Sequence, residues 1–439
     1  MGLTAAPYIL PSGRLFAQTN SQLAGHVVFV LLAGGVRQQE SILQRYLSDS
    51  QEINIEGNIM PNLFDGQAPE QKIVYGTTGF DGQDGGVPIP KVLSRSLASQ
   101  GTLFREVQVS KGGTGHYNNL SNAVSGYYGV SQGLQNRPLH PTIFEYARRL
   151  GGFQASDVWF VGNGIGNSTP LLNYSTHPDF GRYYGANFFA PTVTFGGAGE
   201  RHLKGFKNYH PEEELDPIRR MQAFLNQSFM VEGREIPHLD NTEEEVYDIK
   251  QFIKQTFERK ERGQIISPPV SDNGDLVTLT YAAQVMEWFK PKITVLNMNS
   301  IDVCHGDFTA YLKALHRGDH GVGWLWSFIQ NNIPEMRDDT IMIVMPEHGR
   351  NLNPNPILDT NNWYGYDHSG DVNSRRMWSL MVGPNVPQGL QVGEEDNPDN
   401  VVSDQTDIVP TIAEILGFKQ RVYNEGLIDP VARSLFDRI

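Results

Sequence analysis

Short, continuous apolar runs recur along the chain, each bounded by glycine, proline or charged residues. Runs that do not alternate with polar positions predict strands buried on both faces, as in a parallel sheet. The predicted strands lie at 26–33, 102–109, 157–162, 292–297, 340–345 and 377–382. Between these runs, apolar residues recur at helical spacing. The predicted helices lie at 36–47, 91–100, 116–128, 142–150, 211–229, 242–262, 276–289, 307–330 and 404–416.

The alternation of strands and helices predicts an α/β fold, built on a mostly parallel sheet with helices on both faces. We expect one large domain at 26–439, with an inserted helical region at about 211–290 and an N-terminal arm or signal remnant at 1–25. Gly34 and Gly35 follow the first strand. Before a helix, such a pair would suit an anion at the helix N-terminus, although a plain strand–turn–helix unit is the simpler interpretation.

Composition narrows the classes of function. The chain has 439 residues, of which 39% are hydrophobic and 19% charged, as in a globular rather than a disordered protein. A formal net charge of −14 without any basic run argues against nucleic acid and anionic membrane surfaces as partners. No apolar stretch approaches the roughly 18 residues of a membrane span. The single cysteine, Cys304, excludes an intramolecular disulfide and cysteine-based zinc sites.

The N-terminal segment 2–19 resembles the tail of an export signal, with small and apolar residues before a candidate cleavage point at 15–18. A charged leading segment is missing, and Pro7 and Pro11 interrupt the apolar part, so an ordinary N-terminal arm is the alternative. We therefore expect a periplasmic or secreted bacterial protein, with a cytoplasmic location as the alternative.

Candidate chemistry lies where the strand at 340–345 ends. The chain passes directly from this strand into Glu347 and His348, and ligands in open α/β sheets bind at the carboxyl ends of strands. Asp367 and His368 follow one loop later, just before the next strand. A carboxylate beside a histidine, twice, supplies the oxygen and imidazole ligands that a divalent metal ion takes. The alternative is that each histidine is a solvated or hydrogen-bonded loop residue.

Several segments resemble, in order, the motifs of the alkaline phosphatase/sulfatase superfamily. The stretch 88–109 is similar to its helix–strand unit, and 116–126 to its nucleophile helix ending in Thr/Ser-Gly. The Glu-His-Gly that begins at Glu347 resembles its Asp-His-Gly motif. The stretches 366–370, 380–389 and 403–418 resemble its last metal histidine, its Gly-Pro turn and its C-terminal helix. The resemblance covers most of the chain and implies an alkaline phosphatase-like fold.

The resemblance also implies ligands for one or two adjacent metal positions. Asp302, His305 and His368 match the first position, although Asp302 and His305 stand one residue closer than in the usual pattern. At the second position, Ala33 stands where the first-strand aspartate belongs, Glu347 replaces another aspartate, and His348 is kept. Since carboxylates neutralise the charge of an ion, the missing aspartate predicts a weakened second position. We expect zinc, calcium or manganese at one position rather than two, with no metal as the alternative.

The nucleophile of the superfamily is a threonine, a serine or a modified cysteine. Its place, nine residues before Ser125, is taken by His116, and the nearest hydroxyl belongs to Thr114. His116 and Thr114 are therefore the candidates for the attacking group or its base, although neither has a visible reason to be activated. A capping histidine at the edge of the core is the alternative for His116. Cys304 lies outside any modified-cysteine motif.

A closer resemblance is to a sulfatase-like family of exported bacterial proteins of unknown function. There the first strand also ends in Ala-Gly-Gly, and a later strand carries Glu-x-Gly-Arg, here 347–350. Its Asp-His-Gly is similar to 367–369, and its Asp-x-His before a long helix is similar to 302–305. The N-terminal arm would then be the remnant of a twin-arginine signal whose arginines the sequence lacks. Arg350 is expected either in a surface ion pair or in contact with an anion.

Two hypotheses of function stay open. The first is a sulfatase- or phosphatase-like pseudoenzyme with a degenerate metal site, acting as a binding or structural component within a protein assembly. The second is a metal-dependent hydrolase with a rearranged site that cleaves a small phosphoric or sulfuric ester. A third hypothesis, glycan binding by the aromatic and glycine-rich stretch 163–210, rests on composition only. The two main hypotheses differ in whether the candidate ligands converge within metal-binding distance.

Overall fold

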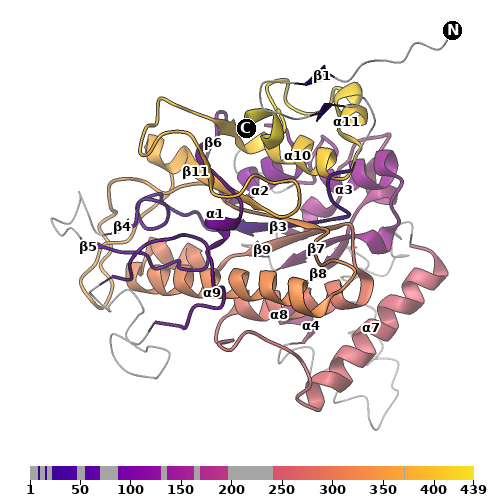
Figure 1. The fold of residues 1–439 in the computed structure, drawn as a ribbon, viewed down its shortest axis with the longest axis horizontal. Helices are drawn as coiled ribbons and strands as arrows, with labels where there is room; N and C mark the ends of the chain where they lie inside the picture. The colour runs from indigo at the N-terminus through magenta and orange to yellow at the C-terminus, as the bar shows by residue number, and fades with distance from the viewer. Residues whose placement is uncertain are drawn as a thin grey trace.

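The computed structural model describes residues 8–9, 15–16, 22–46, 55–69, 88–129, 136–162, 169–195, 241–369 and 371–439. Figure 1 shows these parts as a central sheet between two layers of helices. This arrangement confirms the predicted α/β fold with helices on both faces. Within the described ranges, none of the helices has the length and apolar character needed to span a bilayer.

A nine-stranded sheet runs through the described residues in the order β12-β6-β11-β10-β3-β9-β7-β8, and β13 pairs with β6. The strands are β3 (His26–Leu32), β6 (Thr102–Gln108), β7 (Val158–Gly162), β8 (Asn187–Phe189), β9 (Ile293–Met298), β10 (Thr340–Pro346), β11 (Arg376–Val382), β12 (Leu390–Val392) and β13 (Ser403–Asp404). β3, β9 and β10 run parallel, and β7 joins them through β9. Only β11 runs antiparallel to its neighbours in this sheet, so the prediction of a mostly parallel sheet is confirmed.

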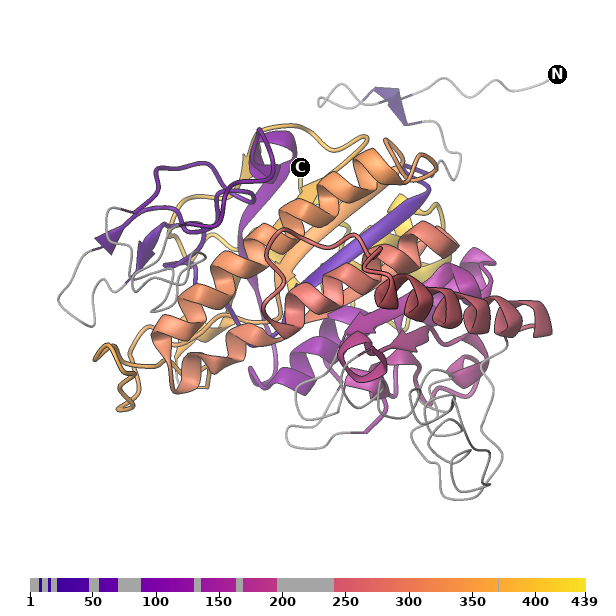
Figure 2. The ribbon, with the colours of Figure 1, turned by 90° about the horizontal axis from the view of Figure 1, so that it is seen from below.

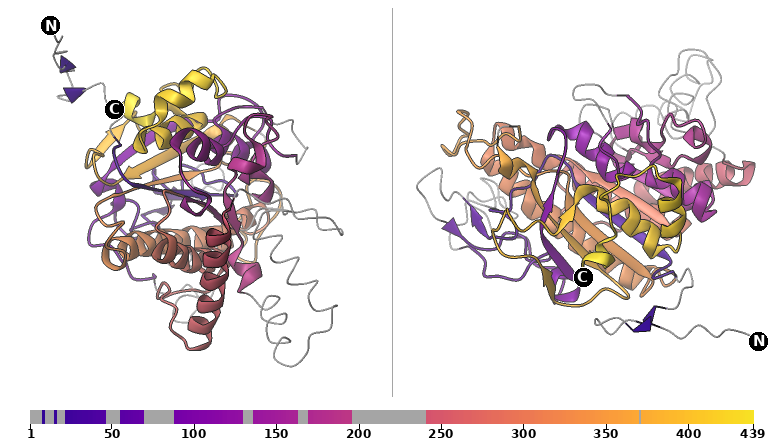
Figure 3. Two further views of the ribbon diagram at one scale, coloured as in Figure 1. Left: turned by 90° about the vertical axis from the view of Figure 1, so that its right-hand side faces the viewer. Right: turned by 90° about the horizontal axis from the view of Figure 1, so that it is seen from above.

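Helices cover both faces of the sheet (Figure 3). One face packs against α8 (Gly274–Phe289) and α9 (Phe308–Asn332), which run alongside β3 in Figure 2. The other face packs against α2 (His116–Ser125), α3 (Ile143–Tyr146), α10 (Ile408–Ile415) and α11 (Lys419–Glu425). The remaining helices are α1 (Leu97–Gln100), α4 (Pro191–Thr194) and α7 (Glu243–Glu261). Two small ribbons pair β1 (Tyr8–Ile9) with β2 (Leu15–Phe16) and β4 (Arg45–Tyr46) with β5 (Ile55–Glu56). Because each central strand is buried on both faces, its sequence is mostly apolar.

The predicted helix at 36–47 is wrong, because the chain forms irregular turns there. Its polar residues are buried rather than arranged on a solvent-facing side: Arg37 pairs with Glu40, and Gln38 donates to the backbone of Arg105 and Met377. Consecutive polar residues are buried here, whereas a regular helix on the surface would turn some of them toward solvent. Neither the plain strand–turn–helix unit nor the alternative of an anion at a helix N-terminus applies, because no helix follows Gly35.

Other predicted helices are shorter or differently wound. The one predicted at 91–100 is reduced to α1, and the one at 142–150 is α3 followed by a turn of π-helix at Ala147–Gly151. The helix predicted at 211–229 lies outside the described residues, as does the whole stretch 196–240. The boundaries of the predicted inserted helical region stay a prediction.

Candidate metal centre

The parallel strands deliver the candidate residues to one edge of the sheet. Glu347 and His348 follow β10 directly, and Asp302 and His305 lie in the short 3₁₀-helix at Ser300–His305 that follows β9. Because β9 and β10 run parallel to β3 on either side of it, their carboxyl ends meet at the same edge. Residues separated by more than 40 positions in the sequence therefore become neighbours.

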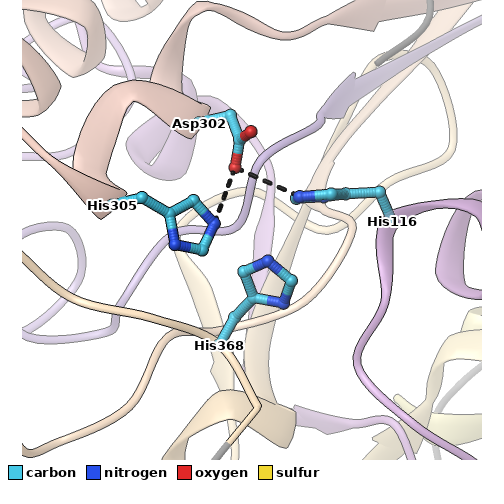
Figure 4. Close-up of side chains that lie close together, drawn as sticks. All are labelled: His116, Asp302, His305 and His368. Carbon is cyan, nitrogen blue, oxygen red and sulfur yellow. Dashed lines mark ion pairs between the residues drawn. The ribbon is translucent and has the colours of Figure 1, made fainter. Parts of the chain in front are cut away.

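Two further histidines complete the cluster. His116 is the first residue of α2, reached from the end of β6 through a glycine-rich turn, and Gly115 rather than His116 occupies the N-cap position. His368 comes from the loop between β10 and β11. Figure 4 shows His116 and His368 converging on Asp302 and His305, which share one 3₁₀-helix. The structure thus brings together all five predicted metal ligands and the candidate His116.

The outer group consists of His116, Asp302, His305 and His368. Asp302 Oδ1 lies 3.1 Å from His116 Nε2 and 3.3 Å from His305 Nε2 (Figure 4). One ligand atom from each of the four residues lies within 4.8 Å of the others. The side chain of His305 is 39% exposed and that of Asp302 is 28% exposed, so this group faces solvent.

The inner group consists of His116, Glu347 and His348, whose ligand atoms also lie within 4.8 Å of one another. Glu347 Oε1 lies 3.0 Å from His348 Nε2, and His116 Nδ1 is hydrogen-bonded to the same oxygen. The backbone N–H of Gly34 donates to this oxygen at 2.7 Å. Glu347 and His348 are fully buried, so this group lies beneath the outer one.

Three of the four histidines are oriented as metal ligands usually are. In His348 and His368, Nδ1 donates to a backbone carbonyl, that of Gly349 at 2.6 Å and that of Thr114 at 2.7 Å. In His305, Nδ1 donates to the carboxylate of Asp367 at 2.6 Å. A proton on Nδ1 leaves the Nε2 lone pair directed into the cluster, and such outer acceptors fix the tautomer of ligating histidines.

The chemistry of the cluster fits a divalent cation. Glu347 Oε2 is fully buried and has no hydrogen-bond partner among the described residues. An unpaired buried carboxylate oxygen is costly, and a cation would satisfy it. Imidazole nitrogens with carboxylate oxygens are the ligands of zinc and manganese, whereas calcium prefers an all-oxygen set. The residues therefore fit zinc or manganese better than calcium.

Two glycines allow the first-strand turn to touch this cluster. Gly34 and Gly35 adopt φ values of +112° and +82°, which residues with a side chain rarely adopt. A Cβ at Gly34 would lie 2.6 Å from the backbone N of Asp302, and one at Gly35 would overlap the ring of His348. The Ala-Gly-Gly sequence thus supplies close backbone contacts where the superfamily motif has an aspartate.

Arg350 is fully buried, so the predicted surface ion pair is wrong. Its guanidinium donates to the carbonyls of Gly34, Gly35 and Tyr366, and to Asp302 Oδ1 at 2.9 Å. These hydrogen bonds hold the Gly34–Gly35 turn and the carboxylate of Asp302 in fixed positions relative to each other. Nearly all of its donors are engaged by the protein, which leaves little for an external anion.

In the metal-free cluster, the charge depends mainly on the protonation of His116. Burial lowers the pKa of His116, but the neighbouring carboxylates of Glu347 and Asp302 outweigh it and raise the pKa to about 10. Burial raises the pKa of Glu347, but His116 and His348 lower it to about 2. Burial and the nearby His348 lower the pKa of His368 to about 2. In the absence of metal, a protonated His116 therefore carries the positive charge that the two carboxylates require.

Thr114 lies beside the cluster but is already engaged. Its hydroxyl donates to the backbone carbonyl of His368, and its own carbonyl accepts from the ring of His368. Thr114 also lines a cleft of about 740 Å³, together with His368 and Arg375. This volume is typical of a small-molecule site. Arg375 contributes a positive charge to its wall, while its guanidinium donates to the carbonyls of Val109 and Gly112.

Two supporting residues were not predicted. Asp367, which adjoins His368, was noted only as part of an Asp-His pair, yet its carboxylate holds His305 and also accepts from Asn355 at 3.1 Å. Gln405 is fully buried and donates to the backbone carbonyl of Glu347 at 2.6 Å. Gln405 lies within the stretch 403–418 that resembles the C-terminal helix motif, but nothing in the sequence indicates this contact.

No family model matches the sequence, and no curated protein matches it. Among solved structures, the chain is similar to the PsFucS1 sulfatase from Pseudoalteromonas sp., with 12% identity, a TM-score of 0.43, and coverage of 94% of this chain and 73% of that chain. It is similar to a protein in the alkaline phosphatase superfamily from Vibrio parahaemolyticus, with 11% identity, a TM-score of 0.38, and coverage of 91% and 68%. It is also similar to a mutant of the alkaline phosphatase PafA, with 12% identity, a TM-score of 0.44, and coverage of 90% and 96%.

These neighbours are the kinds of protein whose motifs the sequence resembles. At identities of 11–12% and TM-scores below 0.5, the likeness carries no activity, substrate or metal to this chain. The narrower resemblance to an exported family, and the periplasmic location that it implies, stay predictions. Function has to be inferred from the residues of the cluster itself.

Proposed function

We propose that this protein is a metal-dependent hydrolase of phosphoric or sulfuric esters, with the metal held by the outer and inner groups together. One observation carries the proposal: six candidate ligands from four separate segments converge, and the buried oxygen Glu347 Oε2 is left without a partner among the described residues. A protein that had lost its metal chemistry would have no reason to keep an unsatisfied carboxylate among four histidines.

The residues of the chain have distinct tasks in this proposal. Asp302, His305 and His368 would hold an ion in the outer group, and Glu347 and His348 would hold one in the inner group. A divalent ion in such a site makes water a better nucleophile at neutral pH and polarises the oxygen of an ester. The cleft beside His368 would hold the substrate, with Arg375 offering a positive charge to the anionic group. Thr114 would position the loop that carries His368 rather than attack the ester, because its hydroxyl is bonded to that loop.

The second candidate is a metal-binding protein without catalytic activity, which would act as a binding or structural component. It is favoured by the residues at the expected place of the nucleophile. His116 contacts the carboxylates of Glu347 and Asp302, and the nearest hydroxyl, that of Thr114, donates to the carbonyl of His368. Both candidates require a bound metal, so they differ only in turnover.

The test is ester cleavage by protein loaded in turn with zinc, manganese and calcium. The substrates are p-nitrophenyl phosphate, bis-p-nitrophenyl phosphate and p-nitrophenyl sulfate. We expect turnover of at least one substrate that a chelator abolishes and that Glu347→Gln reduces at least about 100-fold. The matched control is Glu335→Gln, whose side chain is exposed and pairs with Lys290.

Turnover that persists in Glu347→Gln would come from a contaminant or from another site and would contradict the proposal. Protein that binds metal but cleaves none of the three substrates would favour the non-catalytic candidate. Protein that binds no metal under any of these conditions would remove both candidates.

A further inference from the structure

One histidine of the cluster differs from the other three. His305, His348 and His368 each use Nδ1 to donate to an acceptor outside the cluster, so each has one nitrogen for a metal. His116 has no such outer acceptor among the described residues. Its two ring nitrogens both face candidate ligands, one toward each group.

The distances assign each nitrogen of His116 to one group. Its Nδ1 is hydrogen-bonded to Glu347 and lies 3.2 Å from His348 Nε2. Its Nε2 lies 3.1 Å from Asp302 Oδ1, on the side where His305 and His368 lie (Figure 4). Metal bonds of about 2.0 Å in tetrahedral geometry separate neighbouring ligand atoms by roughly 3.3 Å. The spacings in both groups are therefore close to those of a coordination sphere.

A single ion cannot use both nitrogens of one imidazole, because their lone pairs diverge from the ring. The inner group without His116 would have only Glu347 and His348, too few protein ligands for a stable site. The outer group without His116 would keep three ligands. Both positions are complete only when His116 serves both.

We propose that the cluster holds two divalent ions and that His116 bridges them as an imidazolate, with Nδ1 on the inner ion and Nε2 on the outer one. This inference rests on the proposed metal binding and goes beyond it. When the second ion binds, the remaining ring proton of His116 passes to solvent, and no bond other than N–H is broken. Asp302 and Glu347 each contribute a negative charge, one to each ion.

The bridge sets the spacing of the two ions. A metal–nitrogen bond of about 2.0 Å on each side of an imidazole ring places the ions about 6 Å apart. Two-metal hydrolases that share an oxygen atom hold their ions about 3.5–4 Å apart. Ala33, directly after β3, offers no ligand group, which is consistent with an inner ion that takes its third ligand from His116.

The test is a titration of the metal-free protein with Cu²⁺, followed by electron paramagnetic resonance. An imidazolate bridge couples the spins of two Cu²⁺ ions, so the integrated signal should rise to about one spin per chain and then fall as the second ion binds. In His116→Ala, the signal should rise without falling. The matched control is His177→Ala, which should behave as the wild type. His177 belongs to neither group of candidate ligands, and its Nδ1 accepts from the backbone N–H of Asp179.

Each result is informative. Two bound ions with the full signal of two spins would overturn the bridge while leaving metal binding intact. Binding of only one ion per chain would also overturn it, and the proposed function would stand on one position. Binding of no ion would overturn the proposed function itself. Retention of the coupled signal in His116→Ala would show that another group connects the ions and would contradict the inference.

Discussion

The two halves of the cluster are built in different ways. The inner residues Glu347 and His348 are fully buried and are held by backbone groups, the N–H of Gly34 and the carbonyl of Gly349. The outer residues Asp302 and His305 are partly exposed and are held by side chains, those of Arg350 and Asp367. A backbone partner cannot be removed by mutation, whereas a side-chain partner can. The outer half should therefore be the one whose metal affinity a change of a supporting side chain can adjust.

The largest expected effect comes from removing the charge of the inner half. Glu347→Gln keeps the shape of the side chain but removes the only anionic ligand of the inner group. We expect a loss of inner-site affinity beyond the 10- to 100-fold that removal of an outer partner costs. Isothermal titration with Zn²⁺ measures this loss, beside the exposed control Glu335→Gln. Unchanged affinity would mean that Glu347 does not ligate the ion.

The close contact between Gly35 and His348 in the inner half can be tested by adding a Cβ at Gly35. Gly35→Ala should lower the free energy of unfolding by about 1–3 kcal/mol for the strained φ, with a further loss because its Cβ overlaps His348. Gly152→Ala is the matched control, since Gly152 has a similar φ of +77° and nothing within 4 Å of its Cβ. Urea unfolding of both variants separates backbone strain from overlap. Equal destabilisation would show that His348 moves aside without cost.

The outer half should respond more gently. Asp367→Asn weakens the acceptor that fixes the tautomer of His305, and loss of such a partner lowers metal affinity by about 10- to 100-fold. Zinc competition with a chromophoric chelator measures the change. Asp399→Asn, on an exposed loop, is the control. A loss that matches that of Glu347→Gln would erase the proposed distinction between the two halves.

The smallest expected effect is a dependence of metal affinity on pH. Because the pKa of His116 is raised to about 10 in the metal-free protein, an ion that binds at neutral pH has to displace its proton. Protons compete more strongly as the pH falls, so apparent affinity should fall by up to about tenfold per pH unit for each displaced proton. Titrations in buffers of different ionisation enthalpy count the protons released. Release of none would contradict a protonated His116.

The sequence predicted the sheet and the place of the site better than the partners of its residues. Unbroken apolar runs identified β3, β9 and β10, and the rule that ligands bind at strand ends placed Glu347 and His348 correctly at the edge. The resemblance to superfamily motifs then indicated Asp302 and His368 as candidate ligands, and that role stays a prediction. The strands and their edge could be predicted because they depend on local pattern and on the direction of parallel strands.

Predictions failed where burial of polar groups decides the structure. The segment after Gly35 has the apolar spacing of a helix, but Arg37 and Glu40 are buried with specific partners and the chain forms turns. From the sequence, Arg350 was expected at the surface in an ion pair or against an anion. In the structure it donates to the carbonyl of Gly34, which is more than 300 positions away in the sequence. Contacts of this kind arise only after the strands are ordered, so no local pattern indicates them.

The central claim is that the converged cluster is a metal centre, and metal content tests it most directly. Native mass spectrometry of the protein, dialysed against Zn²⁺ or Mn²⁺ and then desalted, should show bound ions in the wild type and fewer in His368→Ala. Equal metal content in the two proteins would place the ion elsewhere. Absence of metal from the wild type under both conditions would contradict the account.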